Sequence, residues 1–275
     1  MTYDGGELMK KYIAFFRLRF AMGLQYRSAA LAGMVTQFVW GAMEILVFHA
    51  FHETGADAFP MSLSATASYV WMQQAFLAFF MVYFMENELF DAIKDGNIAY
   101  ELCRPVHIYD MWFARSIANR ASRAALRCAP ILLVAAFLPK PYGISAPADL
   151  KHFLLFLLTM FLGILAVVAF CMIVYGLTFF TLSPEGLRIF FYSVTEFFTG
   201  AVIPLPFFPD PIRRIMEYLP FAAMQNVPLR IYSGSMTDAE MLRAAGLQVF
   251  WLIVMILFGR LLFSCAERRV TVQGG

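Results

Sequence analysis

Residues 152–182 contain no Asp, Glu, Lys or Arg and read HFLLFLLTMFLGILAVVAFCMIVYGLTFFTL. A helix crosses the hydrocarbon layer of a membrane with about 20 mostly apolar residues. This stretch is therefore long enough to span a bilayer with some tilt. The sequence predicts a membrane-spanning helix here, and the rest of the chain can be interpreted around it.

The whole chain shares the apolar character of this stretch. Its 275 residues are 61% hydrophobic and 15% charged, with 30 Phe and 17 Met. Soluble globular domains carry roughly 45–50% apolar and about 25% charged residues. The net charge of +2 provides no basic field that would attract nucleic acid. We therefore expect an all-α integral membrane protein that forms one polytopic domain, contacts the lipid bilayer and has no nucleic-acid partner.

Five further stretches are apolar enough to cross a membrane, although the third of the six is apolar only in its second half. That third stretch carries Arg120, Arg123 and Arg127 near its start. Lys and Arg concentrate in cytoplasmic segments, and most of the 21 basic residues lie inside if both termini are cytoplasmic. The six predicted spans are residues 29–51, 66–85, 117–138, 152–182, 187–203 and 244–264.

Two segments near the cytoplasmic side are amphipathic. Residues 7–26 alternate basic and apolar side chains, which favours a helix lying in the membrane interface; the alternative is an extension of the first span. Residues 86–110 mix acidic and basic side chains with an apolar stripe, and Gly96 suits the residue that ends a helix. Such a unit suits docking to a soluble partner, and the alternative is a solvated loop.

The segment before the last span is rich in proline but remains apolar. Pro204, Pro206, Pro209 and Pro220 fall within residues 204–231, and proline excludes a straight helix. Irregular backbone at membrane depth requires protein or a water-filled cavity around it. We expect an outer re-entrant or interfacial hairpin here, while an ordinary external loop is the alternative.

The sequence lacks the motifs of common catalytic sites. No G-x-x-x-x-G-K-[ST] loop, H-E-x-x-H or G-x-S-x-G occurs, so we expect no ATP site and no catalytic residues in this chain. The four cysteines are far apart, and His49, His52 and Glu53 are explained as polar residues at the end of a span. We expect no metal and no cofactor.

Glu44 and Glu196 are the acidic residues that fall within predicted spans. A charged group costs roughly 2.5–3.5 kcal/mol at the bilayer centre, so such residues face other helices or a cavity. Each could be a proton or substrate site, or a protonated acid that is hydrogen-bonded to a neighbouring helix.

Two stretches and the order of the segments resemble the permease subunit of ABC type-2 family exporters. Residues 91–106 read DAIKDGNIAYELCRPV, which looks like the family's I-x-x-G-x-I-x-x-x-L-x-R-P-V stretch. Residues 200–209 read GAVIPLPFFP and are followed by Leu219-Pro-Phe, which is similar to the family's outer re-entrant region.

The resemblance implies a transport subunit without enzymatic activity, in the cytoplasmic (inner) membrane of a bacterial cell. Separate ATPase subunits would bind ATP and Mg²⁺, and a second permease chain, identical or related, would complete the membrane unit. Residues 86–110 would include the coupling helix, with Leu89, Phe90 and Ile93 filling a pocket on the ATPase. The predicted coupling residues are Glu88, Leu89, Phe90, Asp91, Ile93, Lys94, Asp95 and Arg104.

Three functions remain open at this point. The first is export of an amphipathic compound or lipid, driven by ATP hydrolysis in the partner. The second is proton- or ion-coupled transport through Glu44 or Glu196, which normally predicts internal repeats that this sequence does not show. The third is a membrane-embedded enzyme that acts on a lipid-linked substrate.

Overall fold

The computed structural model describes residues 5–55, 59–181 and 184–268, and it is helical without a strand in those ranges. Short 3₁₀ turns (η2, η3) lie among the α-helices. The elements are α1 (Gly5–Gly23), α2 (Arg27–Gly55), α3 (Leu63–Ala75), α4 (Leu77–Phe80), η2 (Val82–Phe84), α5 (Asn87–Lys94), α6 (Ile98–Leu102), α7 (Ile108–Phe137), α8 (Leu150–Thr178), α9 (Pro184–Phe198), η3 (Leu205–Phe207), α10 (Asp210–Tyr218), α11 (Asn226–Tyr232) and α12 (Asp238–Glu267).

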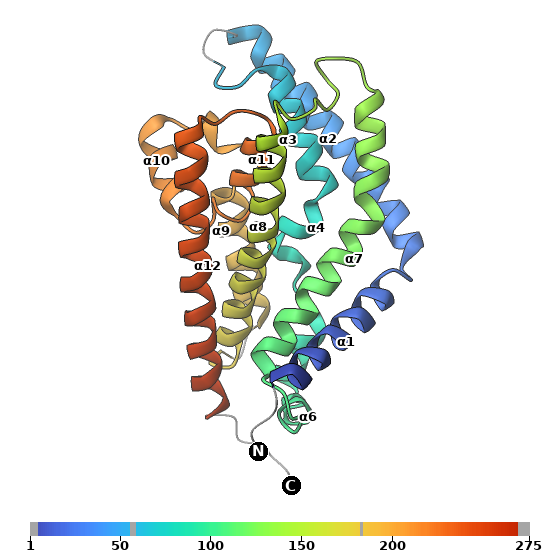
Figure 1. Cartoon of the computed structure of the whole chain (residues 1–275), viewed down its shortest axis with the longest axis vertical. Coiled ribbons are helices and arrows are strands. Elements are labelled where there is room, and N and C mark those ends of the chain that lie inside the picture. Colours follow the sequence, from blue (N-terminus) through green and yellow to red (C-terminus); the bar gives the residue numbers. More distant parts are fainter. Residues whose placement is uncertain (1–4, 56–58, 182–183, 269–275) are drawn as a thin grey trace.

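The long helices run roughly along the long axis of the molecule, and α8 lies between α12 and α7 (Figure 1). Three helices among the described residues are long and apolar enough to cross a membrane: Ala30–Gly55, Leu150–Thr178 and Asp238–Glu267. These three coincide with the first, fourth and sixth predicted spans. The chain is therefore an all-helical protein with the character of a multi-pass membrane protein, while the count of six spans stays a prediction.

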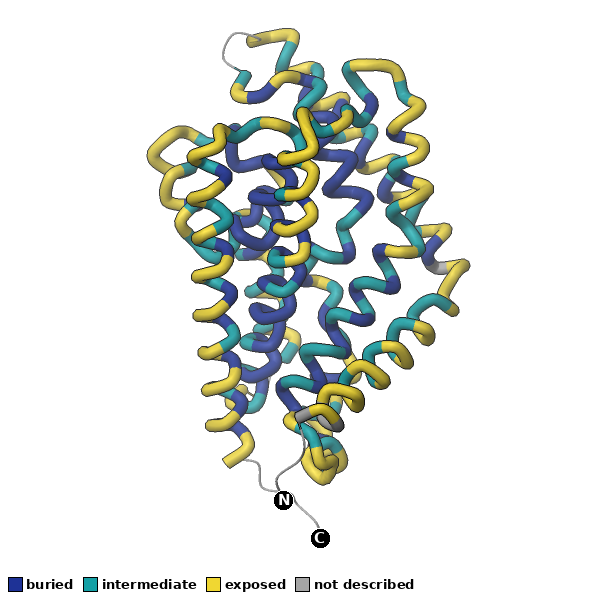
Figure 2. The backbone as a smooth tube through the Cα atoms, viewed as in Figure 1, coloured by how far each residue is buried: buried dark blue, intermediate teal, exposed yellow. Residues whose placement is uncertain are grey.

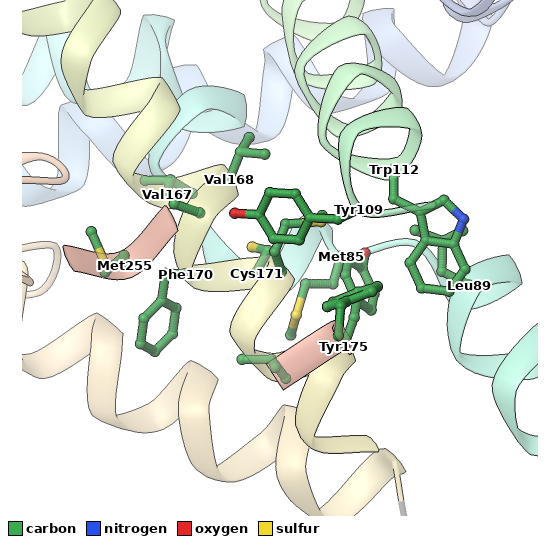
Figure 3. Packing of buried hydrophobic residues seen from close by; sticks show 14 of the residues in the cluster. Met85, Leu89, Tyr109, Trp112, Val167, Val168, Phe170, Cys171, Tyr175 and Met255 are labelled. Carbon is green, nitrogen blue, oxygen red and sulfur yellow. The ribbon is translucent and has the colours of Figure 1, made fainter. Parts of the chain in front are cut away.

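The core is centred on α8. Buried residues concentrate on this helix and on the sides of its neighbours that face it (Figure 2). The largest cluster joins α8 to α5, α7 and α12, and Tyr175, Trp112 and Leu89 belong to it (Figure 3). By contrast, the outward sides of α2 and α12 expose large apolar side chains, as helices in contact with lipid do. They include Leu31, Val35, Val39, Leu46, Phe250, Ile253, Leu257 and Leu261.

The second predicted span is helical but interrupted. α3 ends at Ala75, a single short turn forms α4, and Met81 is extended with φ −74° and ψ 116° before η2 begins. No Gly or Pro occurs in this stretch, so local sequence does not explain the break. A side chain of α7 satisfies the interrupted backbone, as described below.

α1 and α2 are separate helices, because α1 ends at Gly23 and α2 begins at Arg27. Figure 1 shows α1 slanting across the lower part of α7. The start of α1, the end of α12 and α6 lie at the same end of the molecule (Figure 1). The interfacial position of α1 stays a prediction.

The proline-rich segment forms η3, α10 and α11 at the end of the molecule opposite α6 (Figure 1). Pro209 immediately precedes α10, where its fixed φ and missing N–H are tolerated. α11 is enclosed, because residues 226–231 are all buried. The segment is therefore packed protein structure, and its re-entrant position in a membrane stays a prediction.

Candidate functional site

The candidate site begins at α5, the helix that the sequence predicts as the coupling helix. Asp95 ends it by donating its backbone N–H to the carbonyl of Asp91 at 2.8 Å, and Gly96 follows with φ +76°. Only glycine adopts that conformation without strain, as the sequence predicts for Gly96. α6 and the Arg104-Pro105 turn then lead into α7.

α5 has one buried face and one charged face. Leu89 and Phe90 are only 2% and 4% exposed, and the Phe90 ring lies 4.8 Å from the ring of Tyr175 in α8. The chain's own α8 therefore already covers these two side chains, while their contact with a pocket on an ATPase stays a prediction. Ile93 is half-buried against the same cluster.

The opposite side of α5 is open to a partner. The exposed charged residues are Glu88, Asp91, Lys94 and Asp95. Arg104 is also exposed, and its guanidinium lies 3.3 Å from the carboxylate of Glu101. Every charged coupling residue predicted from the sequence is thus accessible, while the apolar ones anchor the helix.

Arg115 of α7 ties down the beginning of α5. Its Nε donates to Oε2 of Glu86 at 2.6 Å, and a terminal guanidinium nitrogen donates to the carboxylate of Glu88. Burial acts to lower the pKa of the Arg115 guanidinium, but the two carboxylates outweigh burial and raise that pKa. The backbone N–H of Glu86 also donates to the hydroxyl of Tyr175 at 2.6 Å. Both α7 and α8 therefore hold the start of α5.

Arg120 explains the interrupted second span. Its side chain is only 3% exposed, and Nη1 donates to the carbonyls of Ala78 at 3.0 Å and Met81 at 2.9 Å. Its other terminal nitrogen lies 3.3 Å from Sγ of Cys171 in α8. The Met81 carbonyl also accepts from the backbone N–H of Phe84 at 3.3 Å, and Arg120 adds a donor to both carbonyls at the break. Sequence reasoning missed this role, and the signal was an arginine inside an otherwise apolar helix.

The two acids that the sequence predicts to lie within spans are on different helices and form no common site. Glu44 of α2 faces α3, where its Oε2 lies 3.5 Å from Nε2 of Gln74. Glu196 is half-buried on α9. Among the described residues no group of His, Cys, Asp or Glu is arranged to hold a metal ion; His49 instead lies 3.2 Å from the hydroxyl of Tyr142.

Side chains of other helices satisfy the irregular backbone around the proline-rich segment. Gln73 of α3 donates to the carbonyl of Ala201 at 2.8 Å. Gln248 of α12 donates to the carbonyls of Thr159 and Ala223, both at 2.8 Å. Irregular backbone surrounded in this way is compatible with membrane depth. Of the four predicted prolines, Pro204 and Pro206 are buried, Pro220 is half-buried and Pro209 is exposed.

The sequence matches the model of a known protein family. The family model described as "ABC-2 family transporter protein" matches residues 35–274, which is most of the chain. The chain belongs to the ABC-2 transporter family. No curated protein matches it at a significant level.

Family membership indicates the role of the whole chain. An ABC-2 family chain is the membrane component of a transporter, so this chain is a transport permease. The predicted resemblance to that family is confirmed by a match that includes residues 91–106 and 200–209. The anchored and partly exposed α5 is then the natural candidate for a contact with another subunit.

Proposed function

We propose that this ABC-2 family chain is the permease of an ATP-driven exporter that moves an amphipathic compound or lipid out of the cell. Separate ABC ATPase subunits bind ATP and Mg²⁺ and supply the energy, because this sequence has no phosphate-binding loop. A second permease chain, identical or related, completes the membrane unit. Family membership supports each of these steps.

We propose six spans in a bacterial inner membrane, with both termini, α5 and α6 in the cytoplasm and α10 outside. The distribution of Lys and Arg supports this orientation. The common location of α6, the start of α1 and the end of α12 also supports it (Figure 1). Accessibility tags test the topology: tags at either terminus and within residues 97–105 should report cytoplasm, and tags at residues 233–236 should report outside. A cytoplasmic signal at residues 233–236 would overturn the six-span arrangement.

The observation that carries the coupling proposal is the division of α5 into two faces. Leu89 and Phe90 fix the helix to α8, so a displacement of α5 by a partner is passed to the core. The exposed charges of Asp91, Lys94 and Asp95 select the partner and its register, as charged groups at interfaces do. Glu88 and Arg104 extend the same charged surface.

Charge reversal on the exposed face of α5 tests this assignment. We propose expressing the Asp91→Lys/Lys94→Glu variant with an ABC ATPase subunit from the same genome. The amount of co-purified ATPase should fall at least about tenfold, and ATP-dependent efflux should fall with it. The permease itself should remain folded because neither side chain is buried.

A matched control reverses an ion pair at the other end of the molecule. Lys151 and Asp238 are exposed, and their charged atoms lie 2.6 Å apart. Lys151→Glu/Asp238→Lys changes the same number of charges and keeps the pair, so ATPase recovery and efflux should match the wild type. Wild-type ATPase recovery and efflux in the α5 variant would contradict the coupling role.

The rival function, proton- or ion-coupled transport, makes a different prediction. It requires Glu44 or Glu196 to change its charge during transport, so Gln at the acid that it uses would abolish efflux at normal expression. Efflux by the ATP-driven permease should survive Glu44→Gln and Glu196→Gln, because the amide keeps the shape and hydrogen bonding of the acid. Loss of efflux in either variant, with normal ATPase recovery, would favour the rival.

A further inference from the structure

A cavity of about 740 Å³ lies between the α1–α2 turn, the beginning of α5, α7 and α9. Small-molecule sites commonly measure roughly 300–1,000 Å³, so this cavity can hold a substantial chemical group. The proposed coupling surface shares only Glu88 with the lining of this cavity. The space itself has no role in the function described so far.

The cavity lining is strongly cationic. It contains five arginines, Arg19, Arg115, Arg123, Arg127 and Arg188, and two carboxylates, Glu86 and Glu88. Five positive and two negative charges leave an excess of three positive charges. Arg115 already occupies both carboxylates, and Arg19 lies 3.9 Å from Glu88. The remaining arginines therefore have no carboxylate of their own in the cavity.

Arg123 and Arg127 are the least compensated of these arginines. The guanidinium of Arg123 lies 5.0 Å from the ring centroid of Phe84. Nε of Arg127 is buried without a hydrogen-bond partner in the part of the chain that the structure describes. No described carboxylate lies within 4.0 Å of either side chain. A half-buried cation without a counter-ion is costly, so both side chains favour a bound anion.

Arg19 gives independent support for a positive field in the cavity. Burial and the nearby charge of Arg115 lower the pKa of the Arg19 guanidinium from its usual range. Arg188 adds a further cation from α9, where its side chain donates to the side chain of Asn87 and to the carbonyl of Tyr83. Cations from three helices, α1, α7 and α9, thus converge on one space.

The chemistry of the lining indicates what the cavity holds. Guanidinium groups present paired N–H donors that match the oxygens of phosphate. Basic pockets between membrane helices on the cytoplasmic side are suited to anionic head groups. Met22, Tyr26 and Leu126 also line the cavity and offer apolar surface beside the cations. This combination suits a molecule with an anionic phosphate at one end and an apolar portion at the other.

We propose that this cavity binds the net-anionic phosphate head group of an amphiphile, one that carries no cation of its own, through Arg123 and Arg127. That this amphiphile is the exported compound rests on the proposed function. Binding itself requires neither ATP nor an ATPase, so it is measured on the purified full-length chain alone. If the wild-type chain recovers no ABC ATPase but binds the amphiphile, the proposed function fails and the site stands.

The test uses lipids that differ in head-group charge. Detergent-purified protein is titrated with dioleoyl phosphatidic acid and, separately, with dioleoyl phosphatidylcholine, and bound lipid is counted by native mass spectrometry. The wild type should retain phosphatidic acid selectively. Arg123→Gln/Arg127→Gln should lower its affinity at least about tenfold, because charge-assisted hydrogen bonds are lost. Arg123→Lys/Arg127→Lys should retain part of the affinity.

A matched control removes the same charge away from the cavity. Arg214 and Arg243 are exposed and do not line it, so Arg214→Gln/Arg243→Gln should bind phosphatidic acid like the wild type. If the double Gln variant at the cavity yields no folded protein, the single variants Arg123→Gln and Arg127→Gln are measured in the same way. Equal binding of the two lipids by the wild type, or unchanged binding by the cavity variants, would overturn the proposal.

Inorganic phosphate distinguishes the two sources of the ligand. If millimolar phosphate displaces phosphatidic acid from the wild type and not from the Gln variants, the site accepts a soluble phosphate as well as a head group. If phosphate does not compete, the lipid chain is required and the occupant comes from the membrane. Either result keeps the phosphate chemistry, whereas displacement that is identical in wild type and variants would contradict it.

Discussion

α7 and α8 are neighbouring helices of 30 and 29 residues, but they are stabilised in different ways. α8 contains one charged residue, Lys151, in its first turn, and it buries most of its residues between 159 and 178 in the core. α7 carries Arg115, Arg120, Arg123 and Arg127, and it is not among the three helices that qualify as spans by length and composition.

Hydropathy identifies helices whose own residues are apolar, and it misses helices whose polar residues are satisfied by other segments. A helix such as α8 needs only apolar surroundings, so its own sequence identifies it. The arginines of α7 need partners: Arg115 finds carboxylates in and before α5, and Arg120 finds carbonyls at the break after α4. The burial of the α7 arginines therefore depends on the segments packed beside this helix. The candidate site lies where those segments meet.

The largest effect is expected at Arg120. Arg120→Met keeps an unbranched apolar stem but removes the guanidinium donor from the carbonyls of Ala78 and Met81. We expect a loss of stability of roughly 3–5 kcal/mol, measured by unfolding in detergent. Arg214→Met at an exposed position is the control and should change stability by less than about 0.5 kcal/mol. Equal stability of the two variants would contradict the claim that α7, unlike α8, is stabilised by polar contacts of its buried arginines.

Arg115 should have the next largest effect. Arg115→Met leaves Glu86, whose side chain is 10% exposed, without its cation, and we expect a loss of about 2–4 kcal/mol. Amide hydrogen exchange in residues 87–94 should accelerate more than in the rest of the chain. The control is Arg260→Met, which removes a 55% exposed partner of Asp110 and should cost about 0–1 kcal/mol. Unchanged exchange in α5 would mean that Arg115 does not hold it.

On α8, the corresponding sensitive position is apolar. A Cβ at Gly163 would lie 2.8 Å from the backbone carbonyl of Met224, so Gly163→Ala must displace the segment before α11. We expect a loss of roughly 1–3 kcal/mol from overpacking. Gly246 of α12 has open space around it, and Gly246→Ala should be neutral or stabilising by up to about 1 kcal/mol. A neutral Gly163→Ala variant would show that α8 packs more loosely than its burial suggests.

The smallest effect concerns the start of α8. Asp149 caps this helix through its carboxylate, which accepts from the backbone N–H of His152 at 2.7 Å, whereas His107 makes no side-chain cap for α7. The backbone and ring hydrogen bonds of His152 hold the pKa of the Asp149 carboxyl below its ordinary value. The cap therefore stabilises α8 fully above the ordinary pKa, and this contribution is lost as pH falls through the lowered value.

Amide exchange at different pH values measures that loss. The first turn of α8 should exchange faster after acidification relative to the intrinsic rate, and Asp149→Ala should show the faster exchange at every pH. Because the carboxylate is exposed, the centre of α8 should not respond. A first turn whose protection is the same in the variant and the wild type would show that this cap contributes nothing.

Prediction from sequence succeeded where one segment carries its own signal. The uncharged run of residues 152–182 identifies α8, and Gly96 marks the end of α5. Prediction failed where the conformation or burial of a segment depends on residues elsewhere in the chain. The break between α4 and η2 has no local Gly or Pro, and an apolar stripe containing Leu89 and Phe90 does not reveal whether a partner or the chain's own α8 covers it.

The order of the contacts of Arg120 along the chain has a consequence for biosynthesis. Its acceptors in Ala78 and Met81 precede it by 42 and 39 residues, so a ribosome completes the interrupted segment before it completes α7. An arginine that enters an apolar environment alone is costly, but here the acceptors already exist when the arginine arrives. Cys171 of α8, which contacts the other terminal nitrogen of Arg120, is synthesised later. The order of synthesis thus provides the acceptors for Arg120 before α7 is complete.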